Sequence, residues 1–156
     1  MRPRSLLIEV LLLSLFTLSA SVQNPHPNVK FQVVQVLESQ QAAWNRHDLE
    51  GFMAGYWNSP DLTFFSGAKM NSGWQSTLGH YRQTYQSEGH EMGRLEFSDL
   101  NVQELSPDAA FVRGAWNLTI SDGKSDQKKP HGLFTLVFRK FPDGWKIIHD
   151  HTSAAE

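Results

Sequence analysis

Residues 144–153 read GWKIIHDHTS, and this stretch decides the fold that the sequence predicts. A turn signal, PDG at residues 142–144, separates it from the apolar run GLFTLVFRKF at residues 132–141. Two apolar runs joined by such a turn are typical of a β-hairpin. The sequence therefore predicts two antiparallel strands here.

Side chains alternate across a strand, so the second strand of this hairpin has two faces. One face would carry Trp145, Ile147, His149 and His151, and the other would carry Lys146, Ile148, Asp150 and Thr152. A loop of two or four residues pairs the first face with Phe134, Leu136 and Phe138. We therefore expect the two histidines to lie at the end of the face that covers the core.

Length and composition allow one domain and exclude several kinds of site. The 156 residues suffice for one hydrophobic core but not for two domains. Aromatic residues make up 12% of the chain, which suits a cavity lined with rings or a ring-rich core. The lack of cysteine excludes disulfides, thiolate metal sites and cysteine nucleophiles. A formal net charge of -2 gives no sign of a nucleic-acid-binding surface.

The N-terminal sequence predicts export. Residues 1–21 hold two arginines, a short apolar run and small residues at their end, the pattern of a secretory signal peptide. Glu9 interrupts the run, so we expect cleavage near Ala20 or Ser21 and no stable membrane span afterwards. Residues 22–28 would form an exposed leader, and the domain would cover residues 29–153. The mature protein is expected to be periplasmic or secreted.

Three helices are predicted in the first part of the domain. The first covers residues 29–47, Asp48 caps the second, and a capping-box pattern, Ser72-x-x-Gln75, opens the third. Each has an apolar stripe at helical spacing: Val33, Leu37, Gln40 and Trp44; then Leu49, Phe52, Met53 and Tyr56; then Trp74, Leu78, Tyr81 and Tyr85.

The strands complete an α+β fold. A short strand at residues 62–65 precedes the third helix, and four strands follow it, at residues 93–105, 109–120, 132–141 and 145–153. Short connections make these four antiparallel. We expect three N-terminal helices packed on a curved, mostly antiparallel sheet.

These features carry a resemblance to a known family. SPDLTFFSGA at residues 59–68, the helix pattern from Trp74 to Tyr85 and the GWKIIHDHTS strand resemble the nuclear transport factor 2-like superfamily, in particular its SnoaL-like branch. The resemblance covers roughly residues 29–153 and implies a sheet that wraps the helices into a cone, as in ketosteroid isomerase. That scaffold hosts isomerases, cyclases, dehydratases and catalytically silent assembly domains, so the resemblance implies a fold rather than one function.

Acid or base catalysis needs a titratable group in a dry cleft. The predicted catalytic residues are His149, Tyr81 and Asp61, with His151 and Asp99 as further candidates. Asp61 follows a proline and could instead organise a turn. The resemblance implies an aspartate base with a tyrosine and a protonated aspartate, as in ketosteroid isomerase, but these three roles do not map residue by residue onto this sequence.

A mostly aromatic set of side chains is predicted to bind the ligand. Such a set describes an apolar small-molecule pocket, although each ring could also simply fill the core. The predicted ligand-binding residues are Trp57, Phe64, Trp74, Tyr81, Phe97, Trp116, His149 and His151.

The two histidines also raise the question of a metal. His149 and His151 would lie about 6 to 7 Å apart on one face, a spacing that suits a metal with a third ligand from a neighbouring strand. His131 could be that ligand, but the hairpin register places it on the opposite face. The sequence therefore predicts no metal site and no organic cofactor, and hydrogen-bonded histidines at the rim of the core are the structural alternative.

Two functions remain open. The first is an exported SnoaL-like domain whose aromatic-lined pocket binds, and could transform, a small apolar molecule; as an enzyme it would be an acid/base isomerase, cyclase or dehydratase. The second is a non-catalytic domain that associates through the other face of its sheet, where Leu133, Val137 and Ile148 would lie. A homodimer is expected in either case.

Overall fold

The computed structural model describes residues 28–88, 90–120 and 129–155. The predicted signal peptide, residues 1–21, and all but the last residue of the predicted leader, residues 22–28, lie outside these ranges. Within them, no helix has both the length and the apolar character needed to cross a membrane.

All three predicted helices are present: α1 (Val29–Asn45), α2 (Leu49–Met53) and α3 (Trp74–Tyr85). The Asp48 side chain caps α2 as predicted, accepting a 2.7 Å hydrogen bond from the Gly51 backbone N–H. The predicted capping box at α3 is wrong. Ser72 belongs to a strand, and the residue that precedes the helix is Gly73, at φ 92°, which makes no side-chain cap.

One sheet of six strands contains β1 (Thr63–Ser66), β2 (Lys69–Ser72), β3 (Arg94–Ser106), β4 (Ala109–Thr119), β5 (His131–Phe141) and β6 (Gly144–Ala154), in the order β2-β1-β6-β5-β4-β3. Strands β3 to β6 form the predicted antiparallel meander. Strand β1 joins the edge of β6 in parallel, and β2, which the sequence analysis did not predict, pairs with β1. Strand β2 reads KMNS and lacks the alternating apolar residues that indicate a strand.

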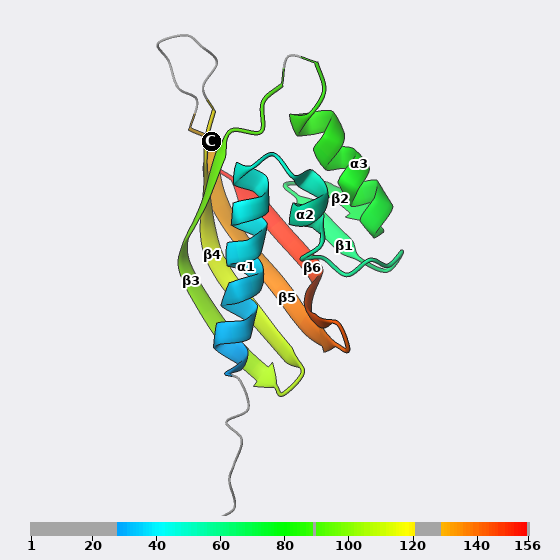
Figure 1. Cartoon of the computed structure of the whole chain (residues 1–156), viewed down its shortest axis with the longest axis vertical. Coiled ribbons are helices and arrows are strands. Elements are labelled where there is room, and N and C mark those ends of the chain that lie inside the picture. Colours follow the sequence, from blue (N-terminus) through cyan, green and yellow to red (C-terminus); the bar gives the residue numbers. More distant parts are fainter. Residues whose placement is uncertain (1–27, 89, 121–128, 156) are drawn as a thin grey trace, which may run out of the picture.

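The helices pack on one face of this sheet, which we call the inner face; the opposite one is the outer face. Figure 1 shows α1 lying across the long strands, with α2 and α3 beside the short strands β1 and β2. The core lies between the helices and the inner face, and Leu37, Phe138 and Ile147 in it are fully buried. The predicted α+β fold, with helices on a curved and mostly antiparallel sheet, is confirmed.

The β5–β6 hairpin contains an extra residue that changes which side chains face inward. Its loop has two residues, one of the two lengths predicted, since Phe141 pairs with Gly144. Further along, Phe138 pairs with Ile147 but Val137 pairs with His149, so Ile148 has no partner on β5 and forms a β-bulge.

The bulge makes the predicted faces of β6 wrong beyond Ile147. Asp150 and Thr152 pair with Leu136 and Phe134, whose side chains are buried on the inner face, so His149 and His151 turn to the outer face. The reason lies outside the hairpin. On its other edge, β6 exchanges hydrogen bonds with Gly55 and Trp57 at Ile147, and with β1 from His149 onward. The bulge at Ile148 lies between the part of β6 that bonds to Gly55 and Trp57 and the part that pairs with β1.

Candidate functional site

A cavity of about 200 Å³ lies between the helices and the inner face of the sheet. Nine of the nineteen residues that line it are aromatic, and they come from every helix, from Tyr56 after α2 and from four of the strands. These rings belong to Trp44, Phe52, Tyr56, Phe64, Tyr81, Tyr85, Phe97, Trp116 and Phe134. An apolar cavity with few polar groups is the usual form of a small-molecule site.

The rings are held in place by contacts with one another and by hydrogen bonds. Trp44 of α1 packs edge-on against Phe52 and Tyr85, at centroid distances of 5.1 and 4.8 Å. Its indole N–H donates a 3.0 Å hydrogen bond to the Met92 carbonyl. Phe52 also packs edge-on against Tyr81 of α3, at 5.3 Å. These contacts hold the rings of the wall in one arrangement.

Asp150 places a carboxyl group in this aromatic surrounding. It is only 4% exposed, and the bulge before it turns its side chain to the inner face. The Tyr56 hydroxyl donates a 2.7 Å hydrogen bond to Oδ2. The other oxygen, Oδ1, is buried and has no hydrogen-bond partner among the described residues. Most buried polar atoms are paired, so this oxygen requires an explanation.

The surroundings change the acidity of the groups at this site. Burial raises the pKa of Asp150 to about 7, although the hydrogen bond from Tyr56 acts in the opposite direction. Burial, followed by the nearby Asp150 charge, raises the pKa of Tyr56 and of Tyr81 well above the usual value. Near neutral pH the tyrosines stay protonated, and Asp150 can gain or lose a proton. A carboxyl group of this kind suits general acid or base catalysis.

The remaining polar groups around the cavity are uncharged near pH 7. His80 of α3 is partly buried, and burial, with a smaller effect of Lys69, lowers its pKa. The Gln40 amide donates a 2.9 Å hydrogen bond to the Phe52 carbonyl. Ser66, Thr152 and Ser153 contribute small polar side chains, and no lysine or arginine is among the described residues that line the cavity.

Four of the eight predicted ligand-binding residues line the cavity: Phe64, Tyr81, Phe97 and Trp116. Their inward direction follows from the helix and strand periodicities on which the prediction depended. Tyr81, also predicted as catalytic, lies near enough to Asp150 for that carboxylate to raise its pKa.

Two other predicted aromatic residues lie outside the cavity. Trp57 stacks on Phe141 of the β5–β6 hairpin, with ring centroids 5.5 Å apart. Trp74, at the start of α3, donates a 2.9 Å hydrogen bond to the Met53 carbonyl and packs on the core. Both rings therefore stabilise the fold.

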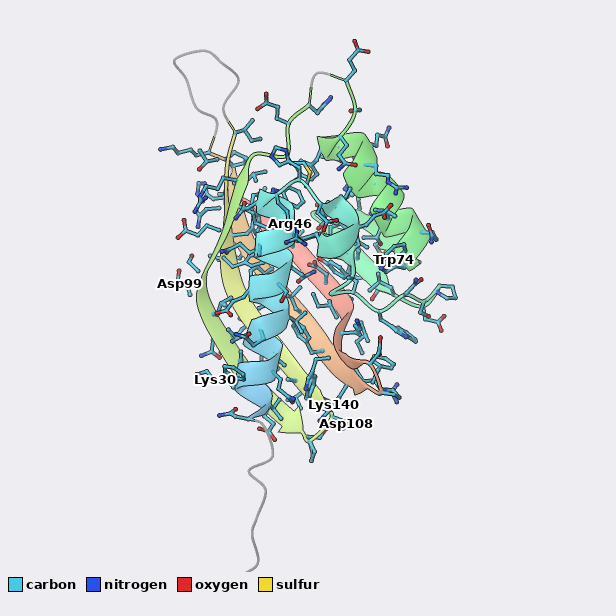
Figure 2. All side chains as sticks on the ribbon, in the orientation of Figure 1. Lys30, Arg46, Trp74, Asp99, Asp108 and Lys140 are labelled. Carbon is cyan, nitrogen blue, oxygen red and sulfur yellow. The ribbon has the colours of Figure 1, made fainter. Side chains whose placement is uncertain are left out.

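The candidate acids Asp61 and Asp99 also lie outside the cavity. Asp61 is exposed in the turn before β1, where its backbone N–H bonds to the Ser59 hydroxyl at 3.0 Å. Asp99 is exposed on the edge strand β3 at φ 54°. Figure 2 shows Asp99 and Trp74 on opposite sides of the molecule.

His149 and His151 lie on the outer face and do not line the cavity. The Nδ1 atom of His149 is 2.6 Å from the Thr63 hydroxyl oxygen, and its ring packs edge-on against Phe65 at 5.0 Å. Burial, and then the neighbouring His151, lower the pKa of His149. In the described part of the chain no three His, Asp or Glu side chains are placed to hold a metal ion, and His131 pairs with Asn117 on β4.

Asp150, like the two histidines beside it, lies on the opposite face from the one that the sequence predicts. Strict alternation along the strand places Asp150 on the same face as Lys146 and Ile148, away from the core. A charged residue in the interior of an apolar strand was the available signal, but nothing in the β6 sequence marks Ile148 as an extra residue.

Comparisons with known proteins agree with this fold. A model of the SnoaL-like domain family matches residues 33–156. No curated protein matches the chain significantly. The chain is similar to a solved NTF-2 like protein of unknown function from Shewanella oneidensis, with 38% identity, a TM-score of 0.70, and coverage of 80% of this chain and 98% of that one.

Two more distant solved structures share the fold alone. A ketosteroid isomerase-like protein from Erwinia carotovora is 19% identical, with a TM-score of 0.65 over 81% of this chain and 95% of that one. A structure described as a calcium/calmodulin dependent protein kinase II association domain, from Xanthomonas campestris, is 17% identical, with a TM-score of 0.66 over 84% of this chain and 91% of that one.

Proposed function

Because the chain belongs to the SnoaL-like domain family and its aromatic cavity holds a buried carboxyl group, we propose that it binds a small, largely apolar molecule there. Asp150 contacts the polar group of that molecule and exchanges a proton with it. Any reaction at this site is acid/base chemistry of the isomerase, cyclase or dehydratase type, with no metal or organic cofactor.

The unpaired Oδ1 atom of Asp150 carries this proposal. A buried carboxyl oxygen without a partner lowers the free energy of unfolding by roughly 1 to 3 kcal/mol, and by more when the group is charged. An apolar side chain at this position would avoid that cost. A polar group on a bound molecule would supply the missing partner, which explains why a carboxyl group is found here.

The neighbours of Asp150 support a role in proton exchange. The Tyr56 hydroxyl fixes the orientation of the carboxyl group, and the rings around it limit its contact with water. A pKa of about 7 lets the same group act as an acid or a base near neutral pH.

Binding can be tested with 2-naphthol and naphthalene as probes. Ser66 lines the cavity from β1, so Ser66→Phe should fill it, whereas Ser72→Phe adds the same ring on the exposed strand β2. We expect 2-naphthol to raise the melting temperature of the native protein and of Ser72→Phe, but not that of Ser66→Phe. Asp150→Asn should remove the preference for 2-naphthol over naphthalene. Equal responses of the two phenylalanine variants would contradict the proposal.

A second candidate function, association through the outer face, is favoured by a separate observation. Leu133 on β5 is 65% exposed, beside a shallow hollow of about 530 Å³ whose lining includes Arg113, Thr135 and His151. A large exposed apolar side chain at such a hollow suits an interface between two copies of the chain. We therefore propose a homodimer through this face, which is compatible with a ligand in the cavity on the other face.

We further propose that the protein is exported, as the signal-peptide pattern of residues 1–21 predicts. The ligand would then be a molecule of the periplasm or of the cell's surroundings.

A further inference from the structure

The distribution of charge around the cavity indicates which class of molecule it binds. We propose that the ligand is an organic cation, a protonated or quaternary ammonium group with apolar substituents, held between Asp150 and the aromatic rings. The proton exchanged with Asp150 belongs to the N–H of a protonated ammonium group or, in a quaternary one, to a neighbouring hydroxyl. This inference depends on the proposed function, because it assigns a ligand class to the same cavity.

No lysine or arginine among the described residues that line the cavity offsets the charge of Asp150. The titratable groups that line the cavity are Asp150, Tyr56, Tyr81, Tyr85 and His80. The three tyrosines are neutral because burial raises the pKa of each, and burial lowers the pKa of His80.

The salt bridges of the described residues involve other carboxylates. They join Arg46 to Asp48, Arg82 to Glu50 and Lys146 to Asp143. Among the described residues, an ionised Asp150 is therefore a buried negative charge whose one hydrogen-bond partner is a hydroxyl, and such a charge is stabilised most by a positive one.

The aromatic walls of the cavity also attract a cation. The face of an aromatic ring carries a partial negative charge. Tryptophan binds ammonium groups best, and tyrosine binds them as well as phenylalanine does. Two tryptophans and three tyrosines line the cavity: Trp44, Trp116, Tyr56, Tyr81 and Tyr85. A wall of rings around one carboxylate matches an ammonium group with apolar substituents. A neutral ligand of the same shape would leave the charge of Asp150 unbalanced.

Choline and 3,3-dimethylbutan-1-ol form a matched pair of probes for this idea. They have nearly the same shape and the same hydroxyl group. Choline has a positively charged nitrogen where the alcohol has a neutral carbon. Isothermal titration at millimolar probe concentrations gives the affinity of the full-length protein for each. We expect choline to bind more tightly than the alcohol.

The pH dependence should separate the two probes further. With a pKa of about 7, the ionised fraction of Asp150 rises from about a tenth at pH 6 to about nine tenths at pH 8. Choline affinity should therefore rise by roughly tenfold over this range, while the affinity for the alcohol should change by less than about twofold.

Three variants connect this behaviour to the carboxyl group. Asp150→Asn keeps the shape and removes the charge, so choline affinity should fall by at least about tenfold while the affinity for the alcohol is kept. Asp143→Asn, the same change on the exposed hairpin turn, should alter neither. Tyr56→Phe removes a hydrogen bond that lowers the pKa of Asp150, so the choline profile should move to higher pH. Circular dichroism melts check that each variant is folded.

The outcomes distinguish this inference from the proposed function. If the alcohol binds as tightly as choline, or only 2-naphthol binds, the proposal of a cationic ligand is overturned. The proposal that the cavity binds a small, neutral molecule then still holds. If none of the three probes binds the folded protein, both proposals are overturned. If choline binds equally well to the native protein and to Asp150→Asn, the role assigned here to the carboxylate is wrong.

Discussion

The protonation state of Asp150 depends on the pH near neutrality. Its carboxyl group is bonded on one side to Tyr56, while the oxygen on the other side has no partner among the described residues. Because its pKa is about 7, small changes near neutral pH alter the charge inside the cavity. The consequences for stability and binding can be measured separately.

Asp150 should make the stability of the protein depend on pH. Folding raises the pKa of this group from 3.8 to about 7, so the folded state keeps a proton that the unfolded state loses. The resulting stabilisation is complete below the lower value and is lost as the pH rises through 7. Relative to the native protein, Asp150→Asn should therefore gain on the order of 4 kcal/mol in unfolding free energy between pH 4 and pH 8.

Urea denaturation of both proteins at several pH values measures this difference. Asp143→Asn is the control, because the same substitution on an exposed turn should show no such trend. A difference between native protein and Asp150→Asn that stays constant with pH would mean that the folded protein does not raise the pKa of Asp150.

His149→Ala should affect stability and leave the cavity unchanged. The substitution removes the 2.6 Å contact with the Thr63 hydroxyl and the edge-on contact with Phe65, both on the outer face. We expect a loss of about 1 to 2 kcal/mol in unfolding free energy and unaltered 2-naphthol binding by the folded protein. Thermal melts with and without the probe measure both quantities. Loss of binding with normal stability would show that His149, despite its position, acts on the ligand.

The secondary-structure elements were predictable where local pattern decides them. Three helices followed from apolar stripes and from the Asp48 cap, and the antiparallel meander followed from its turns. The parallel pairing of β1 with β6 and the bulge at Ile148 were not predictable, because contacts between distant segments determine both. For the same reason Phe64, Tyr81, Phe97 and Trp116 were predicted on the inner side, whereas Asp150 and the two histidines were predicted on the wrong faces.

Helix α3, which carries His80, Tyr81 and Tyr85, contains a glycine whose replacement should stabilise the fold. Gly79 is exposed in the middle of the helix, and an added Cβ would meet no atom within 4 Å. Gly79→Ala should therefore increase the unfolding free energy by about 0.5 to 1 kcal/mol, because alanine loses less backbone entropy in a helix.

Gly132→Ala should have the opposite effect, since its Cβ would overlap the Ser153 carbonyl oxygen across the β5–β6 pair. Chemical denaturation of both variants tests the pair of predictions. A destabilising Gly79→Ala would show that this helix is packed more tightly than the structure describes.

At the scale of the whole molecule, one sheet separates two kinds of surface. The inner face is covered by helices and encloses the cavity, whereas the outer face exposes Leu133 and His151. The binding proposed for the cavity and the association proposed for the outer face can therefore be altered independently by substitution.

The outer face should control association. Leu133→Asp would place a charge at the centre of the proposed interface, and we expect it to shift a dimer to a monomer in sedimentation velocity at micromolar concentration. Phe31→Asp is the matched control, because Phe31 on α1 is 60% exposed on the helical side of the molecule. A native protein that sediments as a monomer at high concentration would exclude this interface.

The N-terminal pattern predicts cleavage during export. Protein recovered from outside the cytoplasm of its native host should lack residues 1 to about 21. N-terminal sequencing or intact mass spectrometry measures the mature start. Exported protein that still begins at Met1 would contradict the prediction.

The extra residue in β6 also bears on how proteins of this shape diverge. In most strands, gaining or losing one residue would turn the apolar side chains away from the core. After Ile148, the residues that would exchange places are an aspartate and two histidines. A relative without that single codon would present imidazole to its cavity in place of a carboxylate. The loss of one amino acid would therefore change which titratable group lies inside the cavity.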